Sequence, residues 1–312
     1  MPYFRLKHGG HVPSIGVMTT ARIALVTGAN QGIGFALVEG LAARMRPDDL
    51  VLLTGRNAQR VADATALVAN APGTRSRVEG RMLDVTDAGA VAKLAAELEE
   101  QHGGVDVVVS NAVARIFPDR PQSEQADEFI DVANGGTHAI LRSFAPVLRP
   151  GGRLIVVASS LGTLGHLDPR LQPLLDGVSL EAVEEAVESW RSAIQAGTAE
   201  EQGWPRWVNV PSKVAQVAAV RAVAAQRRAK DVPEETLIAA VCPGLVDTPT
   251  SRPWFDDFSQ AQTPAQAARA VLDLVLAERI DPATYGELVR HGSVLPWHDG
   301  TPPQYQAQLI NK

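Results

Sequence analysis

The sequence predicts an α/β fold, a doubly wound parallel sheet in a single domain. From Arg22 onward, short apolar runs alternate with longer helical patterns, and the apolar runs are almost continuous in Val, Ile and Leu. Alternation at this spacing is typical of right-handed crossovers between parallel strands. Continuous apolar runs indicate strands that are buried on both faces of the sheet. Because no internal repeat or linker divides the chain, we expect one domain over residues 21 to 312.

The first five strands follow one another with a helix after each of the first four. In order, the segments are "IALVTG" then "GFALVEGLAARM", "LVLLTG" then "RVADATALVAN", "RVEGRMLDV" then "AGAVAKLAAELEEQH", "VDVVVSNA" then a helix near residues 123 to 148, and "RLIVVASS". The last part of the chain predicts a helix at about 211 to 229, the strand "TLIAAVC", a helix over "TPAQAARAVLDLVLAE" and an edge strand near "YGELV".

The alternation is interrupted between about residues 166 and 204. This stretch contains "SLEAVEEAVESWRSAI", an amphipathic pattern with a serine at its cap position and acidic residues in its first turns. These are the start signals of a helix. We therefore expect a helical insertion after the fifth strand that covers the domain and can also line a pocket.

Composition excludes several classes of function. The chain of 312 residues is 45% hydrophobic and 21% charged, which is ordinary for a soluble globular protein. Its formal charge of -6, without a long basic run, argues against nucleic acid, and no run of 18 apolar residues predicts a membrane helix. The single cysteine, Cys242, lies in an apolar run, so we expect a buried thiol and a cytoplasmic location. Residues 1 to 20 are expected to form a disordered or non-native arm.

The segment "TGANQGIG", Thr27 to Gly34, follows the first strand and opens the first helix. In this context the glycines permit a tight turn and a close approach of a pyrophosphate, which the exposed amides of the helix start can bind. The sheet is therefore expected to be of the Rossmann type. After the second strand, "TGRN" places Arg56 where an NAD site would have an acid. A guanidinium suits a 2'-phosphate, so NADP(H) is favoured over NAD(H).

Five further motifs support a resemblance to a known family. They are "LDV", "SNAV", "VANGGT", "RLIVVASSLGTLG" and "CPGLVDT". With the glycine loop, they make the chain from Arg22 to about Trp297 resemble the short-chain dehydrogenase/reductase family. Val113 departs from the family pattern, since a glycine is usual there. Within the family the chain looks most like the monomeric carbonyl reductases, whose helical insertion ends in Gly-Trp-Pro shortly before Tyr-x-x-x-Lys. The resemblance therefore also implies a monomer.

The resemblance implies two sets of site residues for a small-molecule substrate and NADP(H), and no metal. The catalytic set is Asn134, Ser159, Asn209 and Lys213. Counting from Arg153 favours Ser159, with Ser160 as the alternative. The expected cofactor contacts are Gly28, Asn30, Gln31, Gly32, Ile33, Gly34, Arg56, Asp84, Val85, Asn111, Lys213, Pro243, Gly244, Val246 and Thr248.

The stretch "GWPRWVNVPSK" departs from the family at one position. Asn209 stands four residues before Lys213, where the family has its catalytic tyrosine. Realignment does not restore it, since no tyrosine of the chain stands four residues before a lysine; the tyrosines are Tyr3, Tyr285 and Tyr305. An asparagine amide can donate a hydrogen bond but cannot act as a proton donor near neutral pH. The resemblance thus implies a site that lacks its usual acid.

Two functions remain open at this point. The first is an NADPH-dependent reductase of a carbonyl-like or imine-like small molecule, with the proton coming from water on Lys213, from Ser159 or from His166, or with a substrate that needs little protonation. The second is a redox-silent member of the fold that binds NADP(H) or a ligand as an isomerase, cyclase or sensor. The aromatic residues of "TSRPWFDDF" suggest an apolar pocket mouth, although core packing is an equal interpretation of them.

Overall fold

The computed structural model describes residues 21 to 300 and confirms the predicted α/β fold. One sheet of eight strands has the order β3-β2-β1-β4-β5-β6-β7-β8, and every pairing is parallel except that of β7 with β8. The strands are β1 Ile23–Val26, β2 Leu50–Gly55, β3 Arg77–Met82, β4 Val105–Ser110, β5 Leu148–Val157, β6 Leu237–Val241, β7 Leu288–Arg290 and β8 Ser293–Leu295. The arm predicted for residues 1 to 20 lies outside the described residues.

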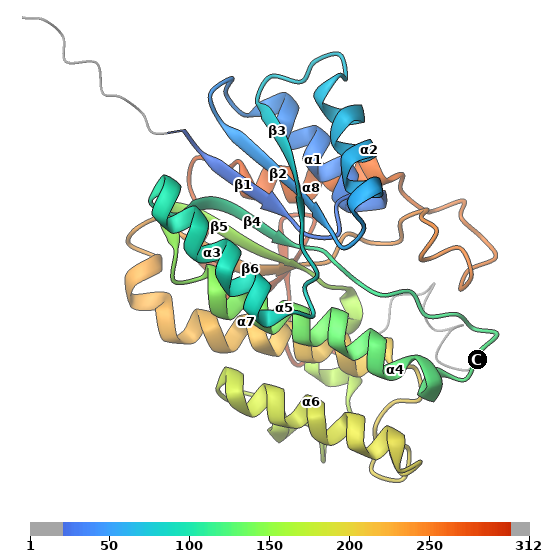
Figure 1. The fold of residues 1–312 in the computed structure, drawn as a ribbon. Helices are drawn as coiled ribbons and strands as arrows, with labels where there is room; N and C mark the ends of the chain where they lie inside the picture. Colours follow the sequence, from blue (N-terminus) through green and yellow to red (C-terminus); the bar gives the residue numbers. More distant parts are fainter. Residues whose placement is uncertain (1–20, 301–312) are drawn as a thin grey trace, which may run out of the picture.

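Helices cover both faces of the sheet (Figure 1). Helices α1 and α8 pack together on one face, whereas α3, α5 and α7 form a neighbouring row on the other. The helices are α1 Gly32–Arg44, α2 Ala58–Ala69, α3 Ala88–His102, α4 Gln122–Ile130, α5 Gly136–Phe144, α6 Leu180–Gln195, α7 Asn209–Asp231 and α8 Pro264–Val275. None of the helices between residues 21 and 300 has the length and apolar character that a membrane crossing requires.

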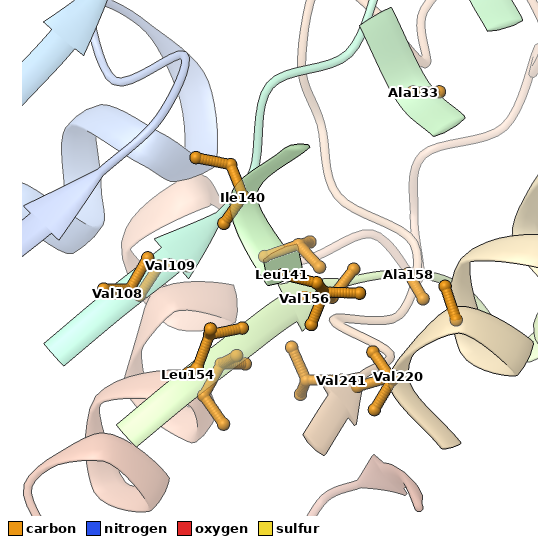
Figure 2. Packing of buried hydrophobic residues seen from close by; sticks show 14 of the residues in the cluster. Val108, Val109, Ala133, Ile140, Leu141, Leu154, Val156, Ala158, Val220 and Val241 are labelled. Atoms are coloured by element: carbon orange, nitrogen blue, oxygen red, sulfur yellow. The ribbon is translucent and has the colours of Figure 1, made fainter. Parts of the chain in front are cut away.

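The core beneath α5 and α7 is formed by aliphatic side chains of the central strands (Figure 2). These side chains are at most 9% exposed, and burying each one contributes about 1.5 to 3 kcal/mol. The strands contribute Val108, Val109, Leu154, Val156 and Val241, and the helices contribute Ile140, Leu141 and Val220. This packing holds α7 against β5 and β6, so the side chains of α7 that face the sheet have defined positions.

The interruption after the fifth strand contains the predicted amphipathic helix, α6. The side chain of Ser179 accepts a hydrogen bond from the amide of Ala182, as expected for its cap. Helix α6 packs against α4 and α7 on the side away from the sheet (Figure 1). Ion pairs tie it to the preceding helices, among them Arg142 with Glu184 at 2.8 Å. The insertion therefore forms a third layer over the helical face that carries α4 and α7.

Two elements differ from the expectation. The helix predicted near residues 123 to 148 consists of α4 and α5 joined by a π-helical turn, Asp131–Gly135. A wide turn of this kind keeps the chain helical, so the spacing of apolar residues does not reveal it. The edge strand near "YGELV" begins later, at Leu288, and is followed by the antiparallel β8. Three residues are too few for β8 to show a sequence pattern.

Candidate active site

Apart from Lys213 on α7, the segments predicted to contact the cofactor lie beyond the carboxyl ends of strands, the edge at which open α/β sheets bind ligands. The glycine loop follows β1, Arg56 follows β2, and Asp84 with Val85 follows β3. Asn111 follows β4, and the segment that begins at Pro243 follows β6. Since parallel strands end at the same edge, the predicted contacts that follow these strands, from Gly28 to Thr248, lie on one side of the sheet.

The loop after β1 requires glycine at several positions. Gly28 and Gly32 have φ values of 60° and 59°, in the left-handed region that favours glycine. A Cβ atom on Gly28 would lie 2.8 Å from the Cα of Ala112, and one on Gly34 would lie 2.5 Å from the Nδ2 of Asn111. The loop is therefore packed tightly against the segment after β4, and its backbone forms the floor of the site.

Asn111 holds this loop in place through backbone contacts. Its Nδ2 donates to the carbonyl oxygens of Thr27 at 3.0 Å and Gly28 at 3.3 Å. A Cβ atom on Gly32 would have the Cγ2 of Thr248 as its nearest neighbour, at 3.8 Å, which is an ordinary van der Waals distance. The side chain of the N-cap residue, Gln31, makes no capping hydrogen bond to the first amides of α1. Amides at the start of a helix, next to a glycine loop, fit the diphosphate of a dinucleotide.

Arginines gather near the end of β2. Arg56 pairs with Glu128 at 3.1 Å, and both side chains are exposed, at 61% and 63%. Arg115, which the sequence did not single out, donates to the Oε1 of Gln31 at 3.1 Å. With Arg60, it borders a hollow of about 440 Å³ beside the glycine loop that Asn30 also lines. Positive charge is therefore available on this side of the loop to an anionic group.

The remaining predicted contacts on the β3 side have structural partners. The carboxylate of Asp84 accepts hydrogen bonds from the amide and hydroxyl of Thr86, at 3.0 and 2.8 Å. Val85 packs against Gly136 so closely that a Cβ there would lie 2.6 Å from Val85 Cγ2. These contacts fix the turn after β3 against the start of α5.

The turn after β6 is similarly fixed. Gln262 donates to the carbonyl oxygen of Pro243 at 2.8 Å, and Gly244 has a φ of 82°. Val246, which is buried, forms an isolated parallel bridge with Gln262. This segment leads to Thr248, whose methyl group would lie 3.8 Å from a Cβ atom on Gly32 of the glycine loop.

Helix α7 begins at Asn209, which the resemblance predicts to stand in the place of a catalytic tyrosine. Asn209 is half-buried there, and Lys213 lies one turn later and is buried. The ammonium of Lys213 donates to the Oε1 of Gln216 at 2.7 Å and to the carbonyl oxygen of Val157 at 3.4 Å. Gln216 was not predicted as a site residue. It is a polar residue on the buried face of α7, three positions after Lys213, and this position could have indicated that it contacts the lysine.

The π-helical turn between α4 and α5 brings Asn134 against α7. The Nδ2 of Asn134 donates to the carbonyl oxygen of Ser212 at 3.0 Å, and its buried Oδ1 has no hydrogen-bond partner among residues 21 to 300. The Nε2 of Gln216 donates to the carbonyl oxygen of Ala133 and to the hydroxyl of Thr137, both at 2.8 Å. The turn and α7 are thus joined by side chains of both elements.

Of the two candidate serines, Ser159 is half-buried and Ser160 is buried. Ser159 follows the end of β5, and its Oγ accepts the amide of Leu161 at 3.3 Å. The imidazole of His166 is bound through Nδ1 to the hydroxyl of Thr163 at 2.8 Å, and burial lowers its pKa. An imidazole with a lowered pKa is a poor source of a proton near neutral pH.

The charge of Lys213 is strongly affected by its environment. Burial lowers its pKa from 10.5 to about 8, because an ammonium loses its hydration in the interior. The electrostatic influence of Cys242 acts in the opposite direction and raises the pKa of Lys213. Lys213 is therefore expected to lose its proton at a pH at which an ordinary lysine stays fully protonated.

Aromatic residues lie beside the start of α7. Trp207, two residues before Asn209, packs against Trp254 with a centroid distance of 5.5 Å. The indole nitrogen of Trp254 donates to the carbonyl oxygen of Ile116 at 3.0 Å. Phe255 and Phe258 form an edge-on pair at 6.2 Å. These contacts join the segment after β4, the segment after β6 and the end of the insertion. Among residues 21 to 300, no group of three metal-binding side chains occurs.

Comparison with known proteins gives consistent matches. A family model described as short chain dehydrogenase matches residues 22 to 167. Carbonyl reductase (NADPH) 1 of Sus scrofa is 28% identical over 92% of this chain and 97% of its own length. Carbonyl reductase (NADPH) 3 of Rattus norvegicus is 29% identical over 89% and 99%.

Solved structures show the same fold. Salutaridine reductase from Papaver somniferum has a TM-score of 0.71 at 22% identity, over 86% of this chain and 99% of its own. Menthone neomenthol reductase from Mentha piperita has a TM-score of 0.70 at 23% identity, over 88% and 100%. At these identities the structural matches establish the fold alone. By sequence, the chain is therefore similar to short-chain dehydrogenases over residues 22 to 167 and to the carbonyl reductases over most of its length.

Proposed function

We propose that the protein is an NADP(H)-dependent oxidoreductase that reduces a carbonyl-like or imine-like small molecule by hydride transfer, in a site without a tyrosine. One observation above all supports this. The ammonium of Lys213 donates a hydrogen bond to the carbonyl oxygen of Val157, which stands two residues before Ser159. The helix that carries Lys213 begins at Asn209, and Asn134 donates a hydrogen bond to its backbone at Ser212. These contacts support a proposed active site near the end of β5, at the edge of the sheet where the cofactor is proposed to bind.

In this proposal the cofactor lies along the carboxyl edge of the sheet, and when bound it supplies the hydride. The diphosphate would rest on the open backbone of the glycine loop, and Arg56 would meet the 2'-phosphate. The residues that would hold it are Gly28, Asn30, Gln31, Gly32, Ile33, Gly34, Arg56, Asp84, Val85, Asn111, Lys213, Pro243, Gly244, Val246 and Thr248. NADPH in the names of the two carbonyl reductases supports the choice of NADP(H).

The residues of this chain would then orient the substrate and stabilise charge on its oxygen or nitrogen. The Oγ of Ser159 can donate a hydrogen bond to that atom, and the amide of Asn209 can do the same. Donors that are aimed at a developing negative charge are typically worth about 10²- to 10³-fold in kcat. The Trp207 and Trp254 pair offers an apolar surface next to Asn209 for the body of the substrate.

The test is NADPH oxidation with a panel of aldehydes, ketones, quinones and cyclic imines. We expect turnover with at least one of them, and we expect Ser159→Ala to lower kcat by about 10²-fold or more. Ser160→Ala is the matched control, because it removes the neighbouring, buried hydroxyl. A loss with Ser160→Ala and not with Ser159→Ala would move the assignment to Ser160. Turnover that withstands both changes would contradict the proposed site.

The second candidate is a redox-silent protein that binds NADP(H) or a ligand as an isomerase, cyclase or sensor. The observation that favours it is the amide of Asn209 in the place of the general acid, since losing such an acid costs about 10²- to 10⁴-fold. Asn209→Tyr separates the two candidates. If native protein is inactive across the whole panel and Asn209→Tyr turns over, the redox-silent candidate stands and the reductase proposal fails.

We also propose one domain over residues 21 to 312, with an insertion at about 166 to 204, in a monomeric, cytoplasmic protein. The packing of α6 over α4 and α7 supports the monomer, because the insertion buries a helical face that would otherwise be open to a second copy. The thiol of Cys242 is buried and unpaired, which suits a reducing compartment.

A further inference from the structure

Arg115 lies in the segment that follows β4, and its neighbours fix the position of its backbone. Ala114 and Ile116 on either side of it are buried, whereas Arg115 itself is exposed. The carbonyl oxygen of Ile116 accepts a hydrogen bond from the indole nitrogen of Trp254 at 3.0 Å. Because both flanking side chains are held by packing, the guanidinium of Arg115 projects outward from a backbone that is already in place.

The side chain of Arg115 reaches across the glycine loop. Strand β1 lies between β2 and β4 in the sheet, so the loop after β1 separates the segment after β4 from α2, which follows β2. Arg115 nevertheless borders the hollow of about 440 Å³ that Arg60 and Leu67 of α2 also line. A residue that follows β4 can reach this hollow only by spanning the loop between them.

Arg115 makes a second connection between two segments that already touch. A Cβ atom on Gly28 would lie 2.8 Å from the Cα of Ala112. Three residues further along each segment, the Nη2 of Arg115 donates to the Oε1 of Gln31 at 3.1 Å. Gln31 is the N-cap residue of α1, and its side chain makes no capping hydrogen bond. The guanidinium is therefore held beside the first turn of α1, where the diphosphate is proposed to rest.

The charge of Arg115 is available to an anion. Within residues 21 to 300 it forms no ion pair, and its hydrogen bond goes to the neutral amide of Gln31. The charged side chains that border the hollow are those of Arg60, Asp63 and Arg115, so positive charge is in excess there. Because a guanidinium bonds more strongly to a phosphate than to a neutral amide, a phosphate bound on the loop should displace Gln31 as its partner.

We infer that Arg115 is a clamp for the cofactor: its guanidinium leaves Gln31, binds the diphosphate of the dinucleotide and holds it against the glycine loop. The inference rests on the proposed function, in which this loop binds the diphosphate. The role differs from that of Arg56, which follows another strand and is assigned to the 2'-phosphate. Loss of Arg115 should therefore weaken every nucleotide that carries the diphosphate, whether or not it also carries a 2'-phosphate.

The first measurement compares the Kd of nucleotides by isothermal titration calorimetry at constant salt. ADP carries the diphosphate without a 2'-phosphate, and 2'-AMP carries the 2'-phosphate alone. Arg115→Gln should raise the Kd of ADP, NADH and NADPH by about 5- to 30-fold and leave that of 2'-AMP unchanged. Arg115→Lys keeps the charge without the planar fork, so it should recover part of the loss. Arg120→Gln is the matched control, since Arg120 is an exposed arginine of the same segment that lies over the ring of Phe117.

The second measurement follows the release of bound NADPH into an excess of NADP+ by stopped-flow fluorescence. A guanidinium that closes over the bound diphosphate has to move away before the nucleotide leaves. Arg115→Gln should therefore raise koff by about the factor by which it raises Kd, with little change in kon. Arg120→Gln should leave both rate constants as they are in the native protein.

The outcomes separate this inference from the proposed function. Native protein that binds neither NADPH nor NADH overturns both. An unchanged Kd in Arg115→Gln, or an equal loss of affinity in Arg120→Gln, overturns only the inference. Weaker binding of 2'-AMP with unchanged binding of ADP would assign Arg115 to the 2'-phosphate and would also overturn it. A Kd that rises through a slower kon alone would mean that Arg115 attracts the nucleotide without clamping it, and the inference would fail.

Discussion

Arg56 offers the sharpest test of the cofactor assignment, because its partner in the structure is weak. The pair with Glu128 joins two side chains that are more than half exposed, and such pairs contribute only about 0 to 1 kcal/mol. Hydrogen bonds to a charged phosphate contribute about 1.5 to 3 kcal/mol. The difference leaves roughly 0.5 to 3 kcal/mol in favour of the phosphate, which corresponds to about 2- to 150-fold in affinity. Arg56→Ala should therefore raise the Kd of NADPH by this factor and leave that of NADH unchanged.

Glu128→Gln should act in the opposite direction. It frees Arg56 and removes a negative charge near the phosphate, so the Kd of NADPH should fall by up to about 5-fold. The assay is titration of protein fluorescence with each nucleotide at low and at physiological salt, where screening should reduce both effects. Arg206→Ala is the matched control, since Arg206 forms a similarly exposed pair with Glu200 at 3.1 Å in the segment that ends the insertion.

Equal changes in the Kd of NADPH and NADH, or no change in either, would refute the assignment of Arg56 to the 2'-phosphate. In that case the same titration with Arg115→Ala shows whether the arginine that binds Gln31 takes the role instead. NADPH binding that is stronger in Arg56→Ala would refute the electrostatic reasoning itself.

Two further predictions concern stability. Arg153 is 2% exposed and donates to backbone carbonyls in β5, before β6 and after α8. Arg153→Met should therefore cost about 4 kcal/mol and lower Tm by roughly 7 °C, taking the entropy of unfolding of the 280 residues that the structure describes. Scanning calorimetry checks this, and Arg279→Met, at an exposed arginine, should shift Tm by less than about 1 °C. Burial lowers the pKa of His138 to about 4, so the unfolded chain binds the extra proton first as pH falls below 6.5. Between neutral pH and pH 5, the free energy of unfolding of the native protein should therefore fall by about 2 kcal/mol more than that of His138→Leu. Urea unfolding at both pH values measures this, and an equal pH dependence in the two proteins would contradict the prediction.

Much of the fold could be predicted because its signals are local. Near-continuous apolar runs mark buried parallel strands, and Ser179 marks the start of α6. The glycine loop was recognisable because strand, loop and helix follow in register, and the structure shows that Gly28 and Gly34 have no room for a Cβ. The three-residue strand β8 could not be predicted, since its pairing with β7 depends on the sheet already being formed.

The site was predictable where spacing along the chain defines it. Asn209 could be singled out because it stands four positions before Lys213 on one helix. The partner of Lys213 could not be recognised in the same way. Gln216 acquires its orientation from Ala133 and Thr137, which belong to another helical segment about 80 positions away in the chain. Arg115 was missed for the same reason, since it meets Gln31 only in the folded protein.

The π-helical turn at Asp131–Gly135 makes the length of this part of the chain critical. A wide turn contains one residue more than the α-helical path it replaces, and each residue of a helix advances the side-chain direction by about 100°. Deleting a single residue there would let α4 and α5 run on as one regular helix, but Asn134 and Thr137 could then no longer both face α7. The anchor of Gln216 would be lost although no side chain near Lys213 had been changed. The extra residue of the π-helical turn, more than 70 positions before α7 in the chain, thus determines which side chains of this segment face α7.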